Sequence, residues 1–257
     1  MTGDDARKVA LVTGASEGIG HAIALRLLAD GYRVAMLARQ PEKLRHACDG
    51  LGPDARGFAC DIGNLDEIER TVGEVRRWGG RIDALVNCAS TTRSGTALSL
   101  TDAEWVSGFE IKVLGALRLM RACWPALSEA KGGVINIGGI GARTPRDAAA
   151  MTGPLSASLM ALTKVFADRG VEDGVRVNMI NPGGVLTPRF TAMMEQRAKA
   201  EGRSLDEVLA GMARASGITR LGKPEDVAEL TAYLLSPRAD LLQGAIVDLD
   251  GGMTKSL

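Results

Sequence analysis

Three glycines follow the first apolar run of the chain at a spacing that suits a phosphate group. They are Gly14, Gly18 and Gly20 within Thr13-Gly-Ala-Ser-Glu-Gly-Ile-Gly20, and a helical pattern begins directly after them at His21. Glycines permit a tight turn and a close approach of the backbone to a pyrophosphate, which the free amides of a helix N-terminus stabilise. Because the turn lies between a strand-like and a helix-like run, it predicts a dinucleotide site rather than an ordinary turn.

The second apolar run ends at the position where a dinucleotide-binding fold often places a carboxylate for the adenosine ribose. The sequence there is Leu37-Ala38-Arg39-Gln40, which holds no carboxylate. A guanidinium at Arg39 can instead pair with a 2′-phosphate through two hydrogen bonds. The residues therefore predict that NADP(H) is preferred over NAD(H), although Glu17 stands in the glycine-rich turn where a basic residue would strengthen phosphate binding. An exposed Arg39 without a ligand is the alternative.

Length and charge disfavour several classes of function. The chain has 257 residues, of which 46% are hydrophobic, with 31 Lys plus Arg against 31 Asp plus Glu. A protein without net charge is a poor partner for nucleic acid or for an anionic membrane. The polar start and the lack of a long apolar run predict neither a signal peptide nor a transmembrane helix. We therefore expect a cytoplasmic protein that acts on a small-molecule substrate.

Cysteine and histidine give no sign of a metal site. His21 and His46 lie on predicted helices, with no cysteine or carboxylate at ligand spacing. The cysteines lack Cys-x-x-Cys pairing and are expected to be reduced core thiols. They are Cys48, Cys60, Cys88 and Cys123.

Seven short apolar runs alternate with helix-like stretches along the chain. The runs cover residues 8–12, 33–38, 56–60, 82–87, 133–137, 175–180 and 245–249. Alternating strands and helices indicate a parallel sheet, and nearly continuous apolar runs indicate that helices cover both of its faces. The predicted fold is α/β: a Rossmann-like doubly wound parallel sheet of about seven strands in a three-layer αβα arrangement.

Helix starts and linkers define the domain organisation. Thr101-Asp-Ala-Glu104 and Ser204-Leu-Asp-Glu207 fit the capping box, and Pro224 stands in a first helical turn. No low-complexity linker interrupts the chain, so residues 1–257 are predicted to form a single dinucleotide-binding domain. Residues 187–220 lack strand character and read as a helical pair, either a lid over the ligand cleft or an amphipathic surface excursion.

Six segments resemble, in chain order, the signature segments of short-chain dehydrogenases/reductases. They are Thr13 to Gly20, Cys60-Asp61-Ile62, Asn87-Cys-Ala-Ser90, Asn181 to Thr187, Arg220 to Val227 and Val247 to Gly252. The resemblance covers nearly the whole chain and implies an NAD(P)-dependent oxidoreductase. The cofactor contacts that it implies are Gly14, Ser16, Glu17, Gly18, Ile19 and Gly20 in the turn, Asp61 and Ile62 beside the adenine, Asn87 and Ala89, and Pro182, Gly183, Val185 and Thr187 around the nicotinamide.

The resemblance fails at the residues that would reduce a carbonyl. In the family that this chain resembles, a tyrosine is the acid, and it acts together with a lysine four residues later, a serine and an asparagine. The segment from Ala157 to Lys164 matches without a gap and places Thr152 at the tyrosine and Ser156 at the lysine. Further upstream, Gly139 stands at the serine and Lys112 at the asparagine. The chain thus resembles a divergent member whose four catalytic positions hold other residues.

A reductase of this composition needs a different proton donor. The chain has two tyrosines, Tyr32 and Tyr233, and both are expected to be structural. Lys112 is one candidate, as a buried ammonium of lowered pKa, with a solvated or ion-paired helix lysine as the alternative. Asp147 is another, as a carboxyl donor or, alternatively, a cap of the following helix. The hydroxyls at positions 152 and 156 are expected to hydrogen-bond the ligand or the helix start.

Two functions remain open from the sequence. One is an NADP(H)-dependent oxidoreductase that acts on a small carbonyl or enone compound with a non-standard proton donor. The other is a catalytically silent relative that binds the cofactor as a sensor or scaffold subunit; no residue argues for a lyase or isomerase. The resemblance implies a homodimer or homotetramer built on helices 102–127 and 152–169. Loops holding Arg93 and Arg143 suit an uncharged or anionic ligand, or carry solvated arginines.

Overall fold

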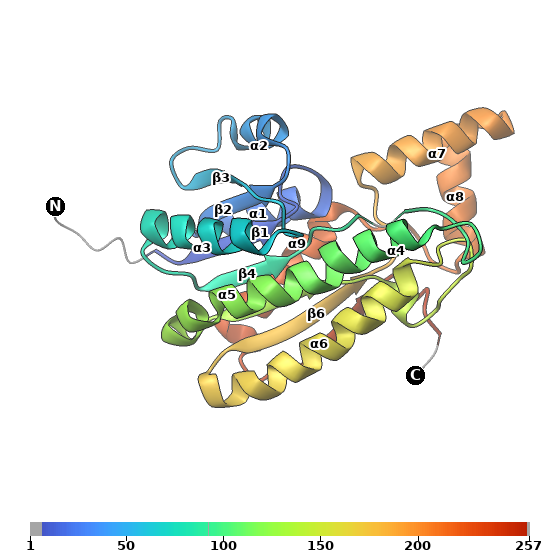
Figure 1. Ribbon diagram of the computed structural model, residues 1–257. Coiled ribbons are helices and arrows are strands. Elements are labelled where there is room, and N and C mark those ends of the chain that lie inside the picture. Colours follow the sequence, from blue (N-terminus) through green and yellow to red (C-terminus); the bar gives the residue numbers. More distant parts are fainter. Residues whose placement is uncertain (1–6, 92, 256–257) are drawn as a thin grey trace.

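The computed structural model describes residues 7–91 and 93–255, and these form one parallel sheet in the order β3-β2-β1-β4-β5-β6-β7 (Figure 1). The strands are β1 (Val9–Thr13), β2 (Arg33–Ala38), β3 (Ala55–Ala59), β4 (Ala84–Asn87), β5 (Gly133–Ile137), β6 (Arg176–Pro182) and β7 (Ile246–Leu249). The chain moves outward from β1 to β3 and then, in the other direction, from β4 to β7. The strand order therefore reverses between β1 and β4, where doubly wound folds bind their ligands.

The predicted α/β fold is confirmed, and each predicted apolar run matches a strand to within two residues at either end. The central strands β1, β4 and β5 are buried along their whole length, which explains why they are apolar except at Thr13, Asn87 and Asn136. Adjacent strands pair in parallel register, with Val9 beside Arg33 and Ala84 beside Gly133.

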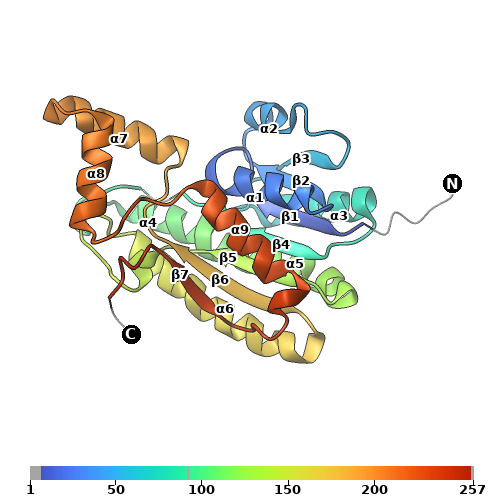
Figure 2. The same ribbon diagram turned by 180° about the vertical axis from the view of Figure 1, so that it is seen from behind.

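Helices cover both faces of this sheet. One face carries α3 (Leu65–Gly79), α5 (Gly115–Ala130) and α6 (Thr152–Asp173), as Figure 1 shows. The opposite face, seen in Figure 2, carries α1 (Gly18–Ala29) and α9 (Pro224–Leu235), which pack against each other, with α2 (Pro41–Cys48) beside β2 and β3. Two short 3-10 turns cover Ile140–Ala142 and Pro237–Ala239. The result is the three-layer arrangement expected from the sequence.

The helix predicted over residues 102–127 is interrupted by a π turn. It begins as α4 (Asp102–Phe109), passes through the π turn Glu110–Leu114 and continues as α5. The capping box predicted at its start is present, with the Thr101 and Glu104 side chains each bonded to the other's backbone amide. A π turn holds one residue more than an α turn, so the hydrophobic period of the sequence does not reveal it.

Two further helices stand at one end of the molecule, shown in orange in Figure 1. They are α7 (Pro188–Glu201) and α8 (Leu205–Ala215), joined through the predicted capping box of Ser204 and Glu207. Met194, Ala198 and Val208 form a small core between them, separate from the main core clusters. No helix in the described part of the chain combines the length and the apolar character needed to cross a membrane.

Candidate active site

A cavity of about 820 Å³ opens at the carboxyl ends of the strands. Its walls come from the segments that follow β1, β2, β4, β5 and β6, and its rim includes residues of α7 and α8. The carboxyl edge near the reversal of strand order is where open α/β sheets bind ligands. The fold therefore places the glycine-rich turn, Arg39, Lys112, Gly139 and Thr152 around one space.

The glycine-rich turn has the geometry that the sequence predicts. Gly14 and Gly18 have φ angles of +66° and +60°, which residues with a Cβ rarely adopt. A Cβ on Gly20 would lie 2.4 Å from the Gly14 carbonyl oxygen, so the turn closes on itself too tightly for a side chain. The Glu17 side chain does not cap α1, and the first amides of this helix remain available to an anion. The turn thus fits the pyrophosphate of a dinucleotide.

The adenosine end of the cavity is more basic than the sequence suggested. Arg39 lines it together with Gln40 and Lys43, the last from the first turn of α2. Glu17 forms an ion pair with Lys43, with 3.7 Å between Nζ and Oε2, so its negative charge is compensated. Sequence reasoning missed Gln40 and Lys43, although their place directly after β2 is the signal that could have found them.

Most of the predicted cofactor contacts line the cavity. These are Gly14, Ser16, Glu17, Gly18, Ile19, Gly20, Arg39, Ile62, Ala89, Pro182, Gly183, Val185 and Thr187. Asp61 and Asn87 lie behind this lining. Asp61 Oδ1 accepts from the Gly63 amide at 2.9 Å, and Asn87 Nδ2 donates to Asn136 Oδ1 at 2.8 Å. The Asp61 side chain therefore shapes the loop after β3, and the Asn87 side chain links β4 to β5.

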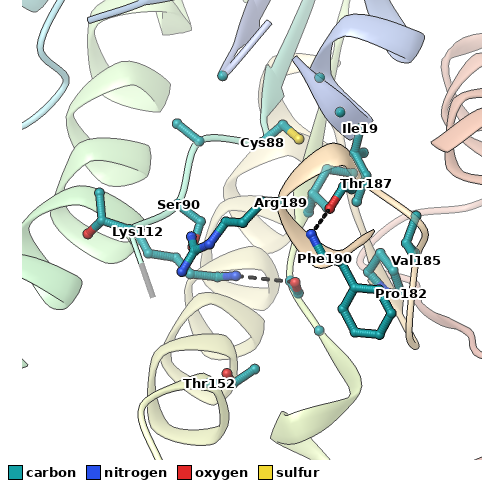
Figure 3. A pocket seen from close by; sticks show the side chains of 18 of the residues that line it. Ile19, Cys88, Ser90, Lys112, Thr152, Pro182, Val185, Thr187, Arg189 and Phe190 are labelled. Carbon is teal, nitrogen blue, oxygen red and sulfur yellow. Dashed lines mark hydrogen bonds between the residues drawn. The ribbon is translucent and has the colours of Figure 1, made fainter. Parts of the chain in front are cut away.

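Lys112 lies on the π turn with its ammonium in the cavity (Figure 3). Its Nζ donates to the Gly138 carbonyl oxygen at 3.2 Å, and the residue is only 6% exposed. Burial lowers the pKa of Lys112 to about 8, while the neighbouring Cys88 acts in the opposite direction. The alternative of a solvated or ion-paired helix lysine is wrong, since no carboxylate of the described residues pairs with it.

The other three positions that the sequence singled out, Gly139, Thr152 and Ser156, lie close together on one side of the cavity. Thr152 begins α6 and lines the cavity. Ser156, one turn later, is fully buried behind the lining, and its Oγ has no hydrogen-bond partner among the described residues. A Cβ on Gly139 would lie 3.5 Å from Thr152 Cγ2 and 3.6 Å from Ser156 Oγ. The structure therefore brings Thr152, Ser156 and Gly139 together, as the register predicts.

The remaining donor candidates lie away from the cavity. Tyr32 and Tyr233 do not line it: Tyr32 precedes β2, where burial raises its pKa, and Tyr233 lies on α9 with 38% of its surface exposed. Asp147 also stays outside, since its Oδ1 accepts from the Ala97 amide at 2.9 Å. Its expected role as a helix cap is wrong because α6 begins five residues later, at Thr152.

Two thiols belong to the cavity lining, those of Cys60 and Cys88. Burial raises the pKa of the Cys88 thiol to about 12, with Lys112 opposing the shift, so this sulfur stays protonated at neutral pH. All four cysteines are free; Cys60 and Cys123 are buried, as expected of core thiols, whereas Cys48 and Cys88 are half-buried. Within residues 7–91 and 93–255, no group of three His, Cys, Asp or Glu side chains could hold a metal ion.

Helix α7 adds a wall that the sequence did not resolve into residues. Thr187 caps this helix, its Oγ1 accepting from the Phe190 amide at 3.2 Å. The first turns of α7 then place Arg189, Phe190 and Met193 along the cavity, and α8 adds Met212. Figure 3 shows Arg189 and Lys112 both extending into this space.

Comparisons with known proteins agree with this geometry. A family model described as enoyl-(acyl carrier protein) reductase matches residues 14–254. The short-chain reductase protein NovJ of Streptomyces niveus is 32% identical over 95% of this chain and 93% of its own. Among solved structures, L-sorbose reductase of Gluconobacter frateurii, complexed with NADPH and L-sorbose, superposes with a TM-score of 0.93 at 32% identity, covering 98% of both chains.

Actinorhodin polyketide ketoreductase with NADPH superposes similarly, with a TM-score of 0.91 at 31% identity over 99% of this chain and all of the other. These matches extend over the sheet, both helical layers and every wall of the cavity. The chain belongs to the short-chain dehydrogenase/reductase family of NAD(P)-dependent oxidoreductases.

Proposed function

We propose that this protein is an NADP(H)-dependent reductase of a small carbonyl or enone compound, and that the Lys112 ammonium supplies the proton. It is a divergent family member, because the positions that match the family's tyrosine, lysine, serine and asparagine hold Thr152, Ser156, Gly139 and Lys112. The observation that carries the proposal is the burial of the Lys112 ammonium in the cavity beside the Gly138 carbonyl.

The residues present fit a dinucleotide phosphorylated on its adenosine ribose. The glycine-rich turn and the open N-terminus of α1 would hold the pyrophosphate, and Arg39 with Lys43 would hold the 2′-phosphate. Pro182, Gly183, Val185 and Thr187 would surround the nicotinamide, as the family resemblance implies. When bound there, NADPH supplies a hydride.

Lys112 suits the work of a general acid at neutral pH. Burial lowers its pKa to about 8, which is near the operating pH that favours proton transfer. One Nζ proton is committed to the Gly138 carbonyl, and the two others remain for a substrate oxygen or a bridging water. An aliphatic hydroxyl such as that of Thr152 is a far weaker acid, so Thr152 and Ser156 would position the substrate oxygen or the start of α6 instead.

The proposal extends to the setting of the protein. Residues 7–91 and 93–255 share one sheet, which supports a single domain, and the separate core of α7 and α8 supports their role as a lid over the cavity. Exposed Val165 and Val171 on α6 support a homodimer or homotetramer built on α5 and α6. Free cysteines support a reducing compartment such as the cytoplasm.

The test measures nicotinamide absorbance with a panel of ketones, quinones and enones. Wild-type protein is expected to oxidise NADPH with at least one class, and kcat/KM is expected to fall as the pH rises above about 8, where Lys112 loses its proton. Lys112→Met should lower kcat by about 10²–10⁴-fold, because the substitution removes the acid. NADPH binding should persist, because Lys112 is not proposed to bind the cofactor.

Lys199→Met, on the exposed side of α7, is the matched control and should leave kcat unchanged. A constant absorbance across the whole panel, with NADPH bound, would overturn the proposal in favour of a silent sensor or scaffold subunit. Turnover that Lys112→Met leaves intact would remove Lys112 from the chemistry.

A further inference from the structure

The charges that line the cavity are strongly unbalanced. Its walls hold six basic side chains and one acidic side chain, in a chain whose total charges are equal. The basic residues are Arg39, Lys43, Arg93, Lys112, Arg146 and Arg189. The acidic residue is Glu17, which lies at the adenosine end in an ion pair with Lys43.

The rest of the lining, which includes Lys112 and Thr152 and is called the chemical end, has Arg93 and Arg146 on its loops and no carboxylate among the described residues. Arg39 and Lys43 lie beside the proposed 2′-phosphate, so the phosphates of the cofactor account for the basic residues of that end alone. A guanidinium keeps its charge at every physiological pH and binds carboxylate or phosphate through paired hydrogen bonds. Arg93 interacts electrostatically with Glu104, but Glu104 does not line the cavity. The lining itself therefore has no anion to balance Arg93 and Arg146, and the cofactor brings none to this end.

Two linked loops present Arg93 and Arg146 at the same rim. Gly95 and Ala149 form an isolated parallel bridge, and the Ala150 amide donates to the Gly95 carbonyl at 3.3 Å. The bond from the Ala97 amide to Asp147 joins the same two loops again. Each arginine lies within three residues of this junction, so the backbone holds Arg93 and Arg146 in two adjoining loops.

Arg143, in the same loop as Arg146, has a different role. Its Nε donates to Asp248 Oδ2 at 3.1 Å, and it does not line the cavity. Arg146 lines the cavity and makes no hydrogen bond or ion pair through its side chain with residues of the described ranges. The sequence suggested Arg93 or Arg143 as the neighbour of an anionic ligand, and the structure favours Arg93 with Arg146.

The lining that α7 and α8 contribute is apolar apart from Arg189 and Ser216. Phe190 and Met193 come from α7 and Met212 from α8, with Leu221 and Met253 near by in the lining. Methionine and phenylalanine side chains suit a flat or irregular apolar group. A ligand that satisfies both parts of the lining has an apolar body beside Phe190, Met193 and Met212 and an anionic group beside the two loops.

We propose that the site selects carbonyl compounds with an apolar body and an anionic group, a carboxylate or a phosphate, and that Arg93 and Arg146 bind this group. That the ligand is a carbonyl compound rests on the proposed function, whereas the binding of its anionic group does not. Arg93 and Arg146 are then specificity-determining residues that never touch the reacting atoms.

The test compares matched neutral and anionic probes on the protein loaded with NADP⁺. One pair is benzoylformate and its methyl ester, and the other is acetoacetyl phosphopantetheine and acetoacetyl pantetheine. In at least one pair, the anionic member is expected to bind about 10-fold to 100-fold more tightly by calorimetry, because paired charge-assisted hydrogen bonds contribute on that scale. The pair that responds identifies the source of the anion as a carboxylate or a phosphate.

Arg146→Met and Arg93→Met should each reduce this preference, and the double variant should abolish it without weakening the neutral probe. Arg214→Met, on an exposed part of α8 outside the cavity, should change neither affinity. Equal affinities of both members in both pairs, or a preference that survives the double variant, would overturn the inference.

Turnover separates this inference from the proposed function. If neutral and anionic carbonyl compounds are reduced with equal kcat/KM, the reductase proposal stands and the anion site falls. If anions bind selectively but no compound is reduced, the anion site stands and the reductase proposal falls.

Discussion

Lys112 and Gly138 are joined by a hydrogen bond from the ammonium to the carbonyl oxygen, across 26 positions of sequence. This bond connects the π turn to the loop after β5, which are the two walls nearest to Thr152. It fixes the ammonium in place without neutralising it, because the acceptor is a carbonyl rather than a carboxylate. A buried cation held in this way lowers the stability of the fold, and this effect can be measured through the dependence of stability on pH.

The first prediction concerns stability and pH. The unfolded chain keeps the Lys112 proton up to about pH 10.5, whereas the folded protein releases it near pH 8. The contribution of Lys112 to the free energy of unfolding therefore rises with pH between these two values. It is constant below pH 8, where the folded and unfolded states are both protonated. Chemical denaturation of wild type should show a rise of up to about 3 kcal/mol across this window.

Lys112→Met should remove that rise and should be more stable than wild type at neutral pH, although it lacks the bond to Gly138. Subtracting the two pH profiles isolates Lys112 from other groups that titrate in the same range. Parallel profiles would show that the ammonium is solvated in the folded protein.

The second prediction concerns the choice of cofactor. Arg39→Ala should raise the Kd of NADPH by about tenfold to a hundredfold and leave that of NADH unchanged, since only NADPH has a 2′-phosphate for the guanidinium. Titration by calorimetry or by nicotinamide fluorescence measures both constants. Arg45→Ala, on the exposed face of α2, is the matched control. An equal loss for both dinucleotides would place Arg39 elsewhere in the site.

The third prediction uses two helical glycines in different surroundings. Gly20→Ala should destabilise the fold by about 1–3 kcal/mol, because the new methyl would meet the Gly14 carbonyl at 2.4 Å. Gly73→Ala, in α3, has nothing within 4 Å of the added carbon and should stabilise by about 0.5–1 kcal/mol. Urea denaturation gives both values. Similar effects of the two substitutions would contradict the tight closure of the turn.

The fourth prediction concerns the lid. Thr187→Ala removes the side chain that caps α7 and should weaken that helix by about 1 kcal/mol. Since α7 and α8 have a core of their own, faster amide exchange should be confined to residues 188–215. Thr187→Ser keeps the accepting oxygen and should restore protection. Faster exchange that spreads through the sheet would show that these helices are not an independent unit.

The sequence predicts the fold well because its signals are local and repeated. Buried parallel strands are apolar at most positions. The glycine turn, both capping boxes and Pro224 mark helix starts, because each satisfies a backbone requirement at that place. The site is predicted less completely. Arg146 and Arg189 line the cavity only because distant segments meet there, and no local pattern distinguishes them from solvated residues.

The state of individual side chains was equally hidden. Arg143 and Arg146 are three residues apart in one loop, yet one is bound to Asp248 and the other faces the cavity. Asp147 reads as a helix cap, but bonds a neighbouring loop because α6 begins later than its position suggests. The hydrogen-bond partners of these side chains depend on contacts between distant segments, which cannot be read from local sequence.

The π turn has a consequence for the whole helix that contains it. Since its loop of hydrogen bonds holds one additional residue, every side chain of α5 is rotated by about 100° from the direction that an unbroken helix starting at Asp102 would give it. A helical wheel drawn over α4 therefore loses its phase at Glu110. Deleting one residue between Glu110 and Leu114 would return the segment to a regular α-helix and turn Lys112 away from the cavity, or else shift the whole of α5 against the sheet.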